Sequence, residues 1–390
     1  MLPEYFEFFV PARIAAGRGM SGSLGPEMEK LGVRRAFVVT DQVLMQLGLV
    51  QKVLDGLAGS AVEVAGIFDE VRPNSEVGLV EKGPGDLPEL ARVAGADVLV
   101  AIGGGSNIDT AKGMNIILSE GGHLLDYEGF GVITRPLKPL VAIPTTAGTG
   151  SEVTQFAVIK HEAIHTKLSF SSPYLAPNLA ILDPELTVNL PPKLTASTGM
   201  DALTHAVETY VSTSWNPIAD GLALEAIRII GANLVEATTN GGNLEARYQM
   251  LVASTMAGMA FSSGMVGCVH AMAHAAGGLF DVPHGIANSI LLPYGMEYNL
   301  EARPEKFREI ARALGNDVED QDPKAGGWTA IEAVFDLAER CGLPRALSEA
   351  GVPEEGLPTM AEAAMVDGAI FTNPRPAEYD EILAVLKKAY

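Results

Sequence analysis

The sequence has few cysteines and few charged residues. Two cysteines, Cys268 and Cys341, are too few for a disulfide framework and fit a reducing compartment. Charged residues make up 19 % of the 390 residues, below the roughly 25 % of an average soluble protein, whereas apolar residues make up 47 %. This composition predicts a large buried surface, in a core or in subunit contacts. We therefore expect a homodimer or a larger homo-oligomer.

Positive charge is the scarcer of the two signs. The formal net charge is −21, and no basic tract offsets it, so we expect no nucleic-acid partner. The first residues, Met-Leu-Pro-Glu-Tyr-Phe-Glu, are acidic where a secretory signal would be basic. Residues 251–280 lack Asp, Glu, Lys and Arg, but glycines, hydroxyl side chains and two histidines argue against a membrane span. We expect a cytoplasmic protein with no membrane segment.

The first half of the chain alternates strand-like and helix-like runs. Apolar, β-rich runs cover residues 35–39, 61–68, 97–102 and 139–143, and each is followed by a polar or glycine-rich loop. Near-continuous apolar strands that alternate with helices predict a parallel sheet covered on both faces. Residues 153–185 look strand-like again.

The strand signal stops at Pro191-Pro192, and helical periodicity follows. We place a domain boundary there, with an α/β domain over residues 1–191 and an all-α domain over residues 192–390. Helices are expected near residues 194–213, 217–237, 245–263, 268–279, 284–299, 304–314, 327–340 and 378–388.

Two loops rich in glycine and hydroxyl side chains follow predicted strands, where ligands bind in open parallel sheets. Gly103-Gly104-Gly105-Ser106 would let the backbone approach a diphosphate at a helix N-terminus, although the G-x-G-x-x-G fingerprint is absent. Thr145-Thr146 and Thr149-Gly150-Ser151 supply hydroxyls and amides in the second loop. One such loop could be a tight turn, but two on neighbouring strands favour a dinucleotide.

Asp41 lies just past the first clear strand, after Thr40. A carboxylate at that place can accept hydrogen bonds from a ribose diol and would repel a 2′-phosphate. The position therefore favours NAD over NADP, although an ordinary turn or helix-capping aspartate would look the same.

Asp201, His205, His270, His274 and His284 form a group of potential metal ligands. Residues four apart share one face of a helix, so Asp201 with His205, and His270 with His274, can each present a pair. One carboxylate with neutral imidazoles suits Fe(II) or Zn(II) rather than Mg or Ca. The metalloprotease motif H-E-x-x-H is absent. A catalytic metal would use three or four of these ligands and keep one position open.

These motifs together resemble the iron-containing, or group III, alcohol dehydrogenases over essentially the whole chain. The resemblance is greatest to the branch that acts on small primary alcohols, aldehydes and diols. The matching stretches are Phe68-Asp69 with Pro73-Asn74, Gly103 to Lys112, Ile143 to Glu152, Asp183 to Leu186, Gly199 to His205, and His270 to Gly285.

The resemblance implies a dinucleotide domain, a helical metal domain and an active site in the cleft between them, as in the dehydroquinate synthase-like architecture. It implies Asp201, His205, His270 and His284 as ligands of Fe(II), with Zn(II) as the second choice, and it places His274 near the substrate instead. The match to the family is looser at Lys167 and at Leu186. Leu186 could equally be an ordinary core leucine. The implied NAD contacts are Asp41, Asn74, Gly104, Gly105, Ser106, Asp109, Thr145, Thr146, Thr149, Ser151, Lys167 and Leu186.

The chemistry expected of these parts is hydride transfer from an alcohol to NAD, with a metal that lowers the pKa of the alcohol. Our hypothesis is that His274 relays the alcohol proton toward solvent, because its ordinary pKa lies near working pH. The alternative for His274 is a core histidine or one that only supports the metal ligands.

Three rival functions share this architecture. A lyase of the dehydroquinate-synthase type and a polyol-phosphate dehydrogenase both need cationic side chains for carboxylate or phosphate groups. Between Leu194 and Leu300 there is no lysine, and the only arginines are Arg228 and Arg247, which favours a small, uncharged alcohol or aldehyde. The third rival is a non-catalytic binding protein with the same fold, and the intact set of metal ligands argues against it.

Overall fold

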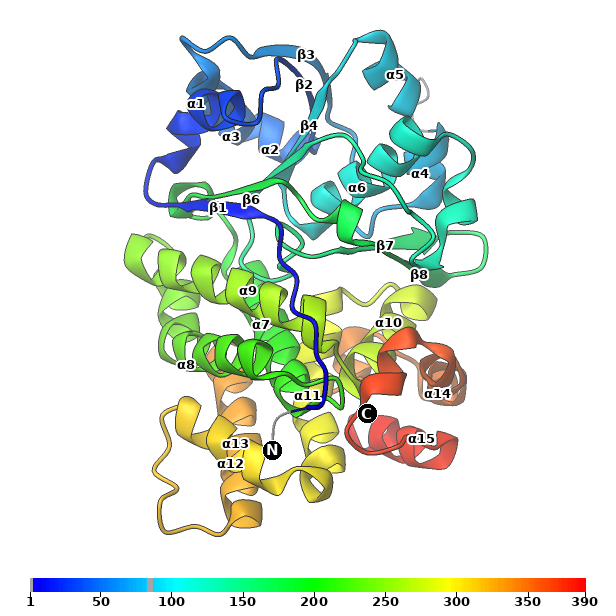
Figure 1. Cartoon of the computed structure of the whole chain (residues 1–390). Coiled ribbons are helices and arrows are strands. Elements are labelled where there is room, and N and C mark those ends of the chain that lie inside the picture. Colours follow the sequence, from blue (N-terminus) through cyan, green and yellow to red (C-terminus); the bar gives the residue numbers. More distant parts are fainter. Residues whose placement is uncertain (1–2, 83–86) are drawn as a thin grey trace. The chain divides into compact units, whose positions relative to one another are not determined.

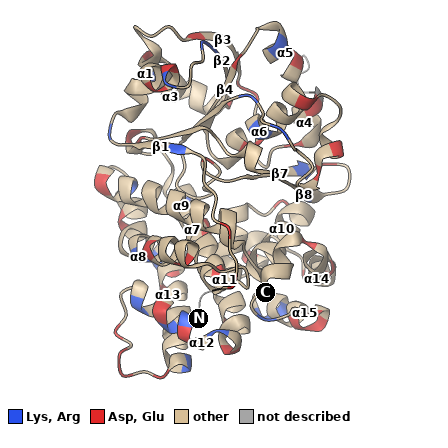
Figure 2. Ribbon diagram, viewed as in Figure 1, with Lys and Arg blue, Asp and Glu red and all other residues tan. Residues whose placement is uncertain are grey.

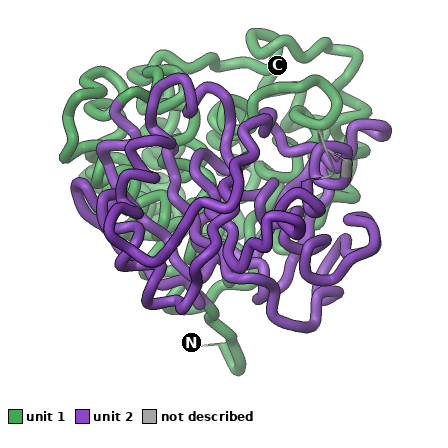
Figure 3. Tube along the Cα trace, turned by 90° about the horizontal axis from the view of Figure 1, so that it is seen from above, with its two compact units in different colours: residues 1–9, 147–150, 189–390 green, residues 10–146, 151–188 purple. Residues whose placement is uncertain are grey.

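The computed structural model describes residues 3–82 and 87–390 (Figure 1). The chain divides into two compact units, which Figure 3 draws in purple and green. One unit comprises residues 10–146 and 151–188, and the other comprises residues 1–9, 147–150 and 189–390. Each unit is described by itself below.

The first unit contains a six-stranded, fully parallel sheet with the order β1-β9-β6-β4-β2-β3. The predicted parallel sheet is therefore confirmed. Two of its strands, at residues 13–16 and 179–182, are short and lie at or near one edge, and only the second falls in a stretch expected to form strands. The strands are β1 (Arg13–Ala16), β2 (Arg35–Val39), β3 (Glu63–Phe68), β4 (Val98–Gly103), β6 (Leu140–Pro144) and β9 (Leu179–Leu182).

Successive residues of the central strands point to opposite faces, and both faces are buried. On one face Val38, Ile102 and Ile143 share a core with side chains of α1 (Leu24–Glu29) and α3 (Leu49–Leu54). On the other face Val39 and Ala101 share a core with side chains of α5 (Leu87–Val93) and α6 (Gly105–Glu120). This burial explains the near-continuous apolar runs in the sequence.

Two further helices and a small second sheet complete this unit. The helices are α2 (Gln42–Gln46) and α4 (Val77–Lys82). The sheet has the order β5-β8-β7, in which β7 and β8 form an antiparallel pair. Its strands are β5 (Gly129–Phe130), β7 (Phe156–His161) and β8 (Thr166–Ser171).

The second unit is helical and has one large apolar core, to which its long helices contribute. The eight predicted helices are present, with ends that mostly shift by one or two residues. The largest difference is at α13, which begins at Pro323 because Asp322 caps it there. A helix at residues 357–366 was not expected. The helices are α7 (Pro192–Val211), α8 (Pro217–Thr239), α9 (Leu244–Gly264), α10 (Cys268–Phe280), α11 (His284–Asn299), α12 (Pro304–Ala313), α13 (Pro323–Arg340), α14 (Leu357–Val366) and α15 (Tyr379–Lys388).

Within the described residues, no single helix has the length and apolar composition to cross a membrane. Among the described residues, one pair of consecutive helices, α9 and α10, meets the two criteria together, and their axes bend by 104° at the break between them.

Candidate active site

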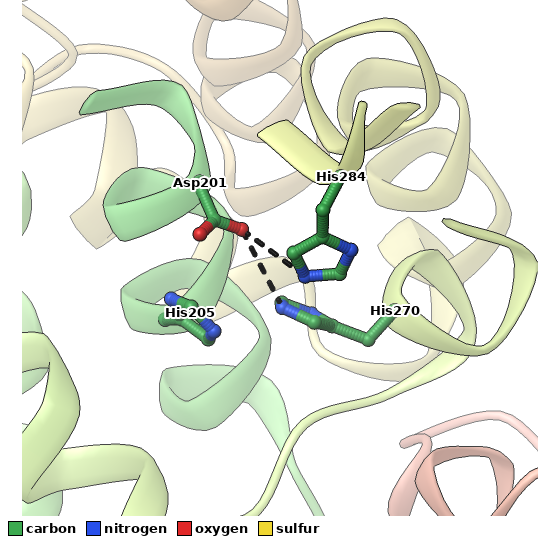
Figure 4. A group of neighbouring side chains, drawn as sticks. All are labelled: Asp201, His205, His270 and His284. Atoms are coloured by element: carbon green, nitrogen blue, oxygen red, sulfur yellow. Dashed lines mark ion pairs between the residues drawn. The ribbon is translucent and has the colours of Figure 1, made fainter. Parts of the chain in front are cut away.

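Four side chains of the helical unit converge on one point (Figure 4). Asp201, His205, His270 and His284 each offer one ligand atom, and these atoms all lie within 4.8 Å of one another. The Oδ1 atom of Asp201 lies 3.4 Å from Nε2 of His284 and 4.0 Å from Nε2 of His270. Three of the four residues are buried, and His284 is partly exposed. One carboxylate and three imidazoles at this spacing match the donor set of a transition-metal site.

Three helices bring these ligands together. Asp201 and His205 stand one turn apart on α7, whereas His270 lies in the first turn of α10. His284 begins α11, directly after Pro283, and the next residue packs tightly against α7. A Cβ atom on Gly285 would come within 2.3 Å of the carbonyl oxygen of Ser197, so only glycine allows α11 to start there. The sequence thereby places His284 beside the ligands of α7.

The surroundings of His205 favour its neutral ring. Burial lowers the pKa of His205 well below its usual value, and positive charge on His270 or His274 would lower it further. The His205 ring stacks on that of His270, with centroids 4.5 Å apart, and on Phe261 at 4.3 Å. A neutral imidazole is the form that binds a metal.

Two buried polar residues hold the ligands in place. The carboxylate of Glu208 accepts a hydrogen bond from Nδ1 of His270, at 2.6 Å, so that Nε2 keeps its lone pair. The side-chain amide of Asn288 donates to Oδ1 of Asp201 at 2.6 Å, and its nitrogen lies 3.2 Å from Nε2 of His284 and 3.3 Å from Nε2 of His270. Glu208 and Asn288 therefore contact members of the four-residue cluster and are not themselves part of it.

His274 lies beside the cluster and outside it. Its ring stacks on that of His284, with centroids 5.3 Å apart, and its Nδ1 atom lies 2.9 Å from Oδ2 of Asp367. Burial by itself would raise the pKa of Asp367, but the His274 ring and the N–H of Ala369 stabilise the carboxylate and lower its pKa overall. The pairing of His270 with His274 that spacing alone suggested is therefore replaced by His270 with His284.

The predicted cofactor loops meet at the carboxyl ends of the parallel strands. Gly104 caps α6, and a Cβ atom there would touch Thr146 at 3.2 Å, so the two loops are neighbours. Thr145 follows β6, and its N–H bonds to the carbonyl of Gly103 at 3.1 Å. On the next side, the hydroxyl of Ser106 accepts from the N–H of Asn74 at 3.1 Å. Gly105 begins α6 between these contacts.

Asp41 stands at the end of β2 as the N-cap of α2. Its Oδ1 accepts from the N–H of Leu44 at 3.0 Å, and its Oδ2 accepts from the amide of Asn107 at 2.8 Å. Asn107 also donates to the carbonyl of Ile102 at 3.0 Å. This amide links the ends of β2 and β4 and holds the Asp41 carboxylate at the edge where the glycine loop lies.

Asp109 and Ser151 bond to each other beneath these loops. The Ser151 hydroxyl donates to Asp109, which also accepts from the N–H of Val158 at 3.1 Å. Burial raises the pKa of Asp109, against the opposing effect of Lys112. Lys112 is fully buried, and its ammonium donates to the hydroxyls of Ser151 and Thr154 and to the carbonyl oxygens of residues 154 and 156. Burial lowers the pKa of Lys112 to about 8, although Asp109 and Glu152 counteract it.

The remaining expected cofactor residues have different settings. Lys167 is close enough to Asp109 for its charge to lower the pKa of the Asp109 carboxyl group. In the antiparallel register of β7 and β8, Lys167 lies opposite Lys160. Leu186 is packed in the sheet core with Val38, which is the setting of a structural leucine. Thr149 belongs to residues 147–150 of the helical unit. Cofactor contact stays a prediction for all three.

Comparison with known proteins gives the family. Residues 11–184 match the model of the iron-containing alcohol dehydrogenases, and residues 195–390 match the C-terminal model of the same family. The chain belongs to the iron-containing alcohol dehydrogenases.

Individual relatives of this dehydrogenase match over nearly its whole length. A 1,3-propanediol dehydrogenase of Klebsiella pneumoniae is 42 % identical over 387 residues, which cover 99 % of each chain. An NAD-dependent methanol dehydrogenase of Bacillus methanolicus is 38 % identical and covers 98 % of this chain and 99 % of its own. A crystal structure of a 1,3-propanediol oxidoreductase superposes with a TM-score of 0.95 at 42 % identity, covering 99 % of this chain and 100 % of that one.

The family implies a nicotinamide dinucleotide and a metal, and the residues of the dehydrogenase fit a metal. Asp201 is a buried carboxyl group beside three imidazoles, where a cation would compensate the desolvation of its charged form. The hydrogen bond between His270 and Glu208 leaves a lone pair at Nε2, beside the other ligand atoms.

Sequence reasoning missed Glu208, Asn288, Asp367, Asn107 and Lys112 as parts of the site. Helical spacing contained a signal for two of them, because Glu208 follows His205 by three residues and Asn288 follows His284 by four. No local pattern could have paired His274 with Asp367, 93 positions away.

Proposed function

We propose that this alcohol dehydrogenase interconverts a small, uncharged primary alcohol or short diol and its aldehyde, with NAD as coenzyme and Fe(II) as the native metal. Zn(II) is the second choice of metal. The observation that carries the proposal is the convergence of Asp201, His205, His270 and His284 within 4.8 Å. When bound, the metal supplies Lewis acidity at the alcohol oxygen.

An uncharged substrate is supported by the distribution of basic residues (Figure 2). Arg228 forms an ion pair with Glu225 on the same helix. Arg247 donates to the hydroxyl of Thr195 at 2.7 Å and to two backbone carbonyls. Both cations between Leu194 and Leu300 are therefore engaged away from the ligand cluster, and these helices supply none for a phosphate or carboxylate. Relatives named for 1,3-propanediol and methanol agree with such a substrate.

Asp41 supports NAD over NADP. Its two hydrogen-bond donors leave each carboxylate oxygen with acceptor capacity for a ribose diol. A phosphate on the same ribose would meet the negative charge of the carboxylate. The relative named as NAD-dependent points the same way.

His274 is proposed to move the alcohol proton. Because Asp367 can only accept a hydrogen bond when ionised, it holds the hydrogen of a neutral His274 ring on Nδ1 and leaves Nε2 as the proton acceptor. The ring stands beside His284 and is partly exposed, so that the proton has a route outward.

The assembly is proposed to be a homodimer or a larger homo-oligomer. Large apolar side chains such as Val366, Phe371 and Phe130 are exposed by 80 %, 76 % and 62 %. Light scattering of the metal-loaded enzyme tests this proposal: a mass equal to one 41.0 kDa chain would contradict it.

The test of the function is purification under nitrogen, metal analysis and an assay of NADH formation with C2–C5 alcohols and diols. The assay is repeated after chelation and after separate return of Fe(II) and Zn(II). Activity that chelation abolishes and one metal restores supports the proposal and identifies the metal. Bound metal without alcohol turnover, but with activity on a phosphorylated polyol or in a lyase assay, would favour a rival function. A protein that binds no metal would contradict the proposal at its base.

A further inference from the structure

Glu208 is a buried carboxylate that the reaction does not use directly. It lies on α7, three residues after His205, and its side chain is 3 % exposed. Its Oε1 accepts from the N–H of Val269 at 2.7 Å, and its Oε2 accepts from the N–H of His270 at 3.2 Å and from Nδ1 of the same residue at 2.6 Å. All three donors belong to the first turn of α10.

These hydrogen bonds determine the state of the His270 ring. Oε2 of Glu208 accepts the backbone N–H of His270, and its 2.6 Å contact with Nδ1 is a hydrogen bond in which Nδ1 carries the hydrogen. The neutral ring then has its lone pair on Nε2, the atom that lies 4.0 Å from Oδ1 of Asp201.

The same contacts fix the backbone of His270. The N-cap of α10 is Gly267, which has no side chain to satisfy the free N–H groups of the first turn. Glu208 satisfies two of them, and Asn373 accepts from the N–H of Cys268 at 3.1 Å. A Cβ atom on Gly267 would lie only 2.9 Å from Oε1 of Glu208, which shows how closely this carboxylate covers the helix end.

We infer that Glu208 is a positioning residue for metal binding, which acts through His270. It sets the tautomer and direction of the His270 ring, so that Nε2 is the atom offered to the metal beside the other three ligand atoms. This inference rests on the proposed metal centre, since it assigns the residue that makes one of its ligands competent.

A purely structural role makes a different prediction. If Glu208 only capped α10, its replacement would destabilise the fold and leave the metal affinity of the folded protein unchanged. If it positions His270, the Glu208→Gln variant has a specific defect, because its amide NH₂ group competes for the place where Nδ1 donates. The ring is then driven toward the tautomer with a hydrogen on Nε2, which blocks metal binding. Glu208→Asp keeps the charge on a shorter side chain and should recover part of the affinity.

Asp183 provides a matched control in the other unit. It is fully buried, and it accepts from the N–H and hydroxyl of Ser21, at 3.0 and 2.6 Å, and from the N–H groups of Gly19 and Glu185, each at 3.1 Å. Asp183→Asn removes a carboxylate of similar burial and hydrogen bonding that has no contact with the ligand cluster. It measures what loss of a buried charge does to stability by itself.

The experiment is a competition titration of Zn(II) against a chromophoric chelator, with full-length wild type, Glu208→Gln, Glu208→Asp and Asp183→Asn, after chelation. Thermal melting and the absorption bands of bound Co(II) are recorded in parallel. We expect Glu208→Gln to bind Zn(II) about 10- to 100-fold more weakly, with shifted Co(II) bands, and Glu208→Asp to fall between it and wild type. Asp183→Asn should melt at a lower temperature and bind Zn(II) as wild type does.

Two outcomes would overturn separate claims. Wild-type affinity and unshifted Co(II) bands in folded Glu208→Gln would refute the role of Glu208 and leave the proposed function standing. Failure of the wild type to bind Zn(II) or Co(II) would refute the metal centre itself.

Discussion

At the scale of single residues, Asp41 has an observed role as a helix cap and a proposed role in coenzyme choice, and the two can be separated. It caps α2 through Leu44, and its charge faces the edge of the sheet where the coenzyme is expected. Asp41→Ala should raise kcat/KM for NADP relative to NAD, because the repulsion of a 2′-phosphate disappears, and should cost roughly 1 kcal/mol of stability through the lost cap. Steady-state kinetics with both coenzymes measure the first effect.

The control is Asp322→Ala, which removes a similar cap from α13. It should cost similar stability and leave the coenzyme preference unchanged. An unaltered ratio of NAD to NADP use in Asp41→Ala would show that this carboxylate does not select the coenzyme.

His274 tests the assignment of proton transfer. His274→Ala should keep the full metal content, since the residue lies outside the four-ligand cluster. Its turnover should fall by about 10²- to 10⁴-fold, as for loss of a general base. Metal content and kcat are measured on one preparation of the variant. Loss of metal would show that His274 is a metal ligand, and an unchanged kcat would show that it does not transfer the proton.

The limit of sequence reasoning at this scale is visible in the ligands themselves. Asp201 and His205 could be paired by helical spacing, because both stand on α7. His270 and His284 could not, because Gly285 and the packing of α11 on α7 decide which histidine completes the cluster. Spacing favoured His274, and only the family resemblance replaced it with His284.

At the scale of elements, the start of α11 is tightly constrained by its packing against α7. Gly285→Ala would push a methyl group to 2.3 Å from the carbonyl oxygen of Ser197, so α11 must shift and carry His284 with it. We expect a loss of about 1–3 kcal/mol in the free energy of unfolding, together with weaker Zn(II) binding. Thermal melting and the chelator competition measure the two effects.

Gly221 is the matched control, because a Cβ atom on this glycine of α8 would meet nothing within 4 Å. Gly221→Ala should keep metal affinity and gain roughly 0.5–1 kcal/mol of stability. Tight metal binding by Gly285→Ala would mean that α11 need not start where it does.

Lys112 ties α6 to the segment that follows the second cofactor loop, and it makes stability depend on pH. Its pKa is lowered by burial to about 8, whereas an unfolded lysine titrates near 10.5. Between these values the unfolded chain binds one proton more than the folded chain, so the contribution of Lys112 to the free energy of unfolding rises with pH, by ~1.4 kcal/mol per unit.

Denaturant titrations of wild type and Lys112→Met at several pH values from 7.5 to 10.5 would isolate this effect. The free energy of unfolding of wild type, relative to that of Lys112→Met, should rise as the pH increases across that window. If the difference in free energy of unfolding did not change with pH, the surrounding oxygens would be holding the Lys112 ammonium at its ordinary pKa.

Sequence patterns predicted elements with a distinct apolar run or helical periodicity better than elements without one. The eight expected helices contribute apolar side chains to one core, and the expected strands β2, β4 and β6 form near-continuous buried apolar runs. The fourth expected strand, β3, lies at the edge of the sheet and is buried only in part. Strand β1 has only four residues, three of them exposed, so it carries no apolar run. Helix α14 follows loops rich in Pro, Glu and Gly, and its short apolar stretch gave no distinct signal.

At the scale of the whole molecule, chain order and spatial units differ. The sequence placed one boundary at residues 191 and 192, whereas residues 1–9 and 147–150 are grouped with the helical unit. Within that unit the N–H of Phe9 bonds to Ser263, and Gly150 packs against Gly258 of α9. Contacts between residues so far apart in the sequence leave no local pattern. The sequence therefore predicted an α/β part and an all-α part, but it could not predict that residues 1–9 and 147–150 belong with the helical unit.

The most direct test of the central claim is anomalous X-ray scattering from a crystal of the metal-loaded enzyme, measured on both sides of the absorption edge of the bound metal. The account predicts one strong peak per chain, at about 2.0–2.2 Å from single atoms of Asp201, His205, His270 and His284. A peak coordinated by His274 in place of His284, or no peak within this cluster, would contradict it.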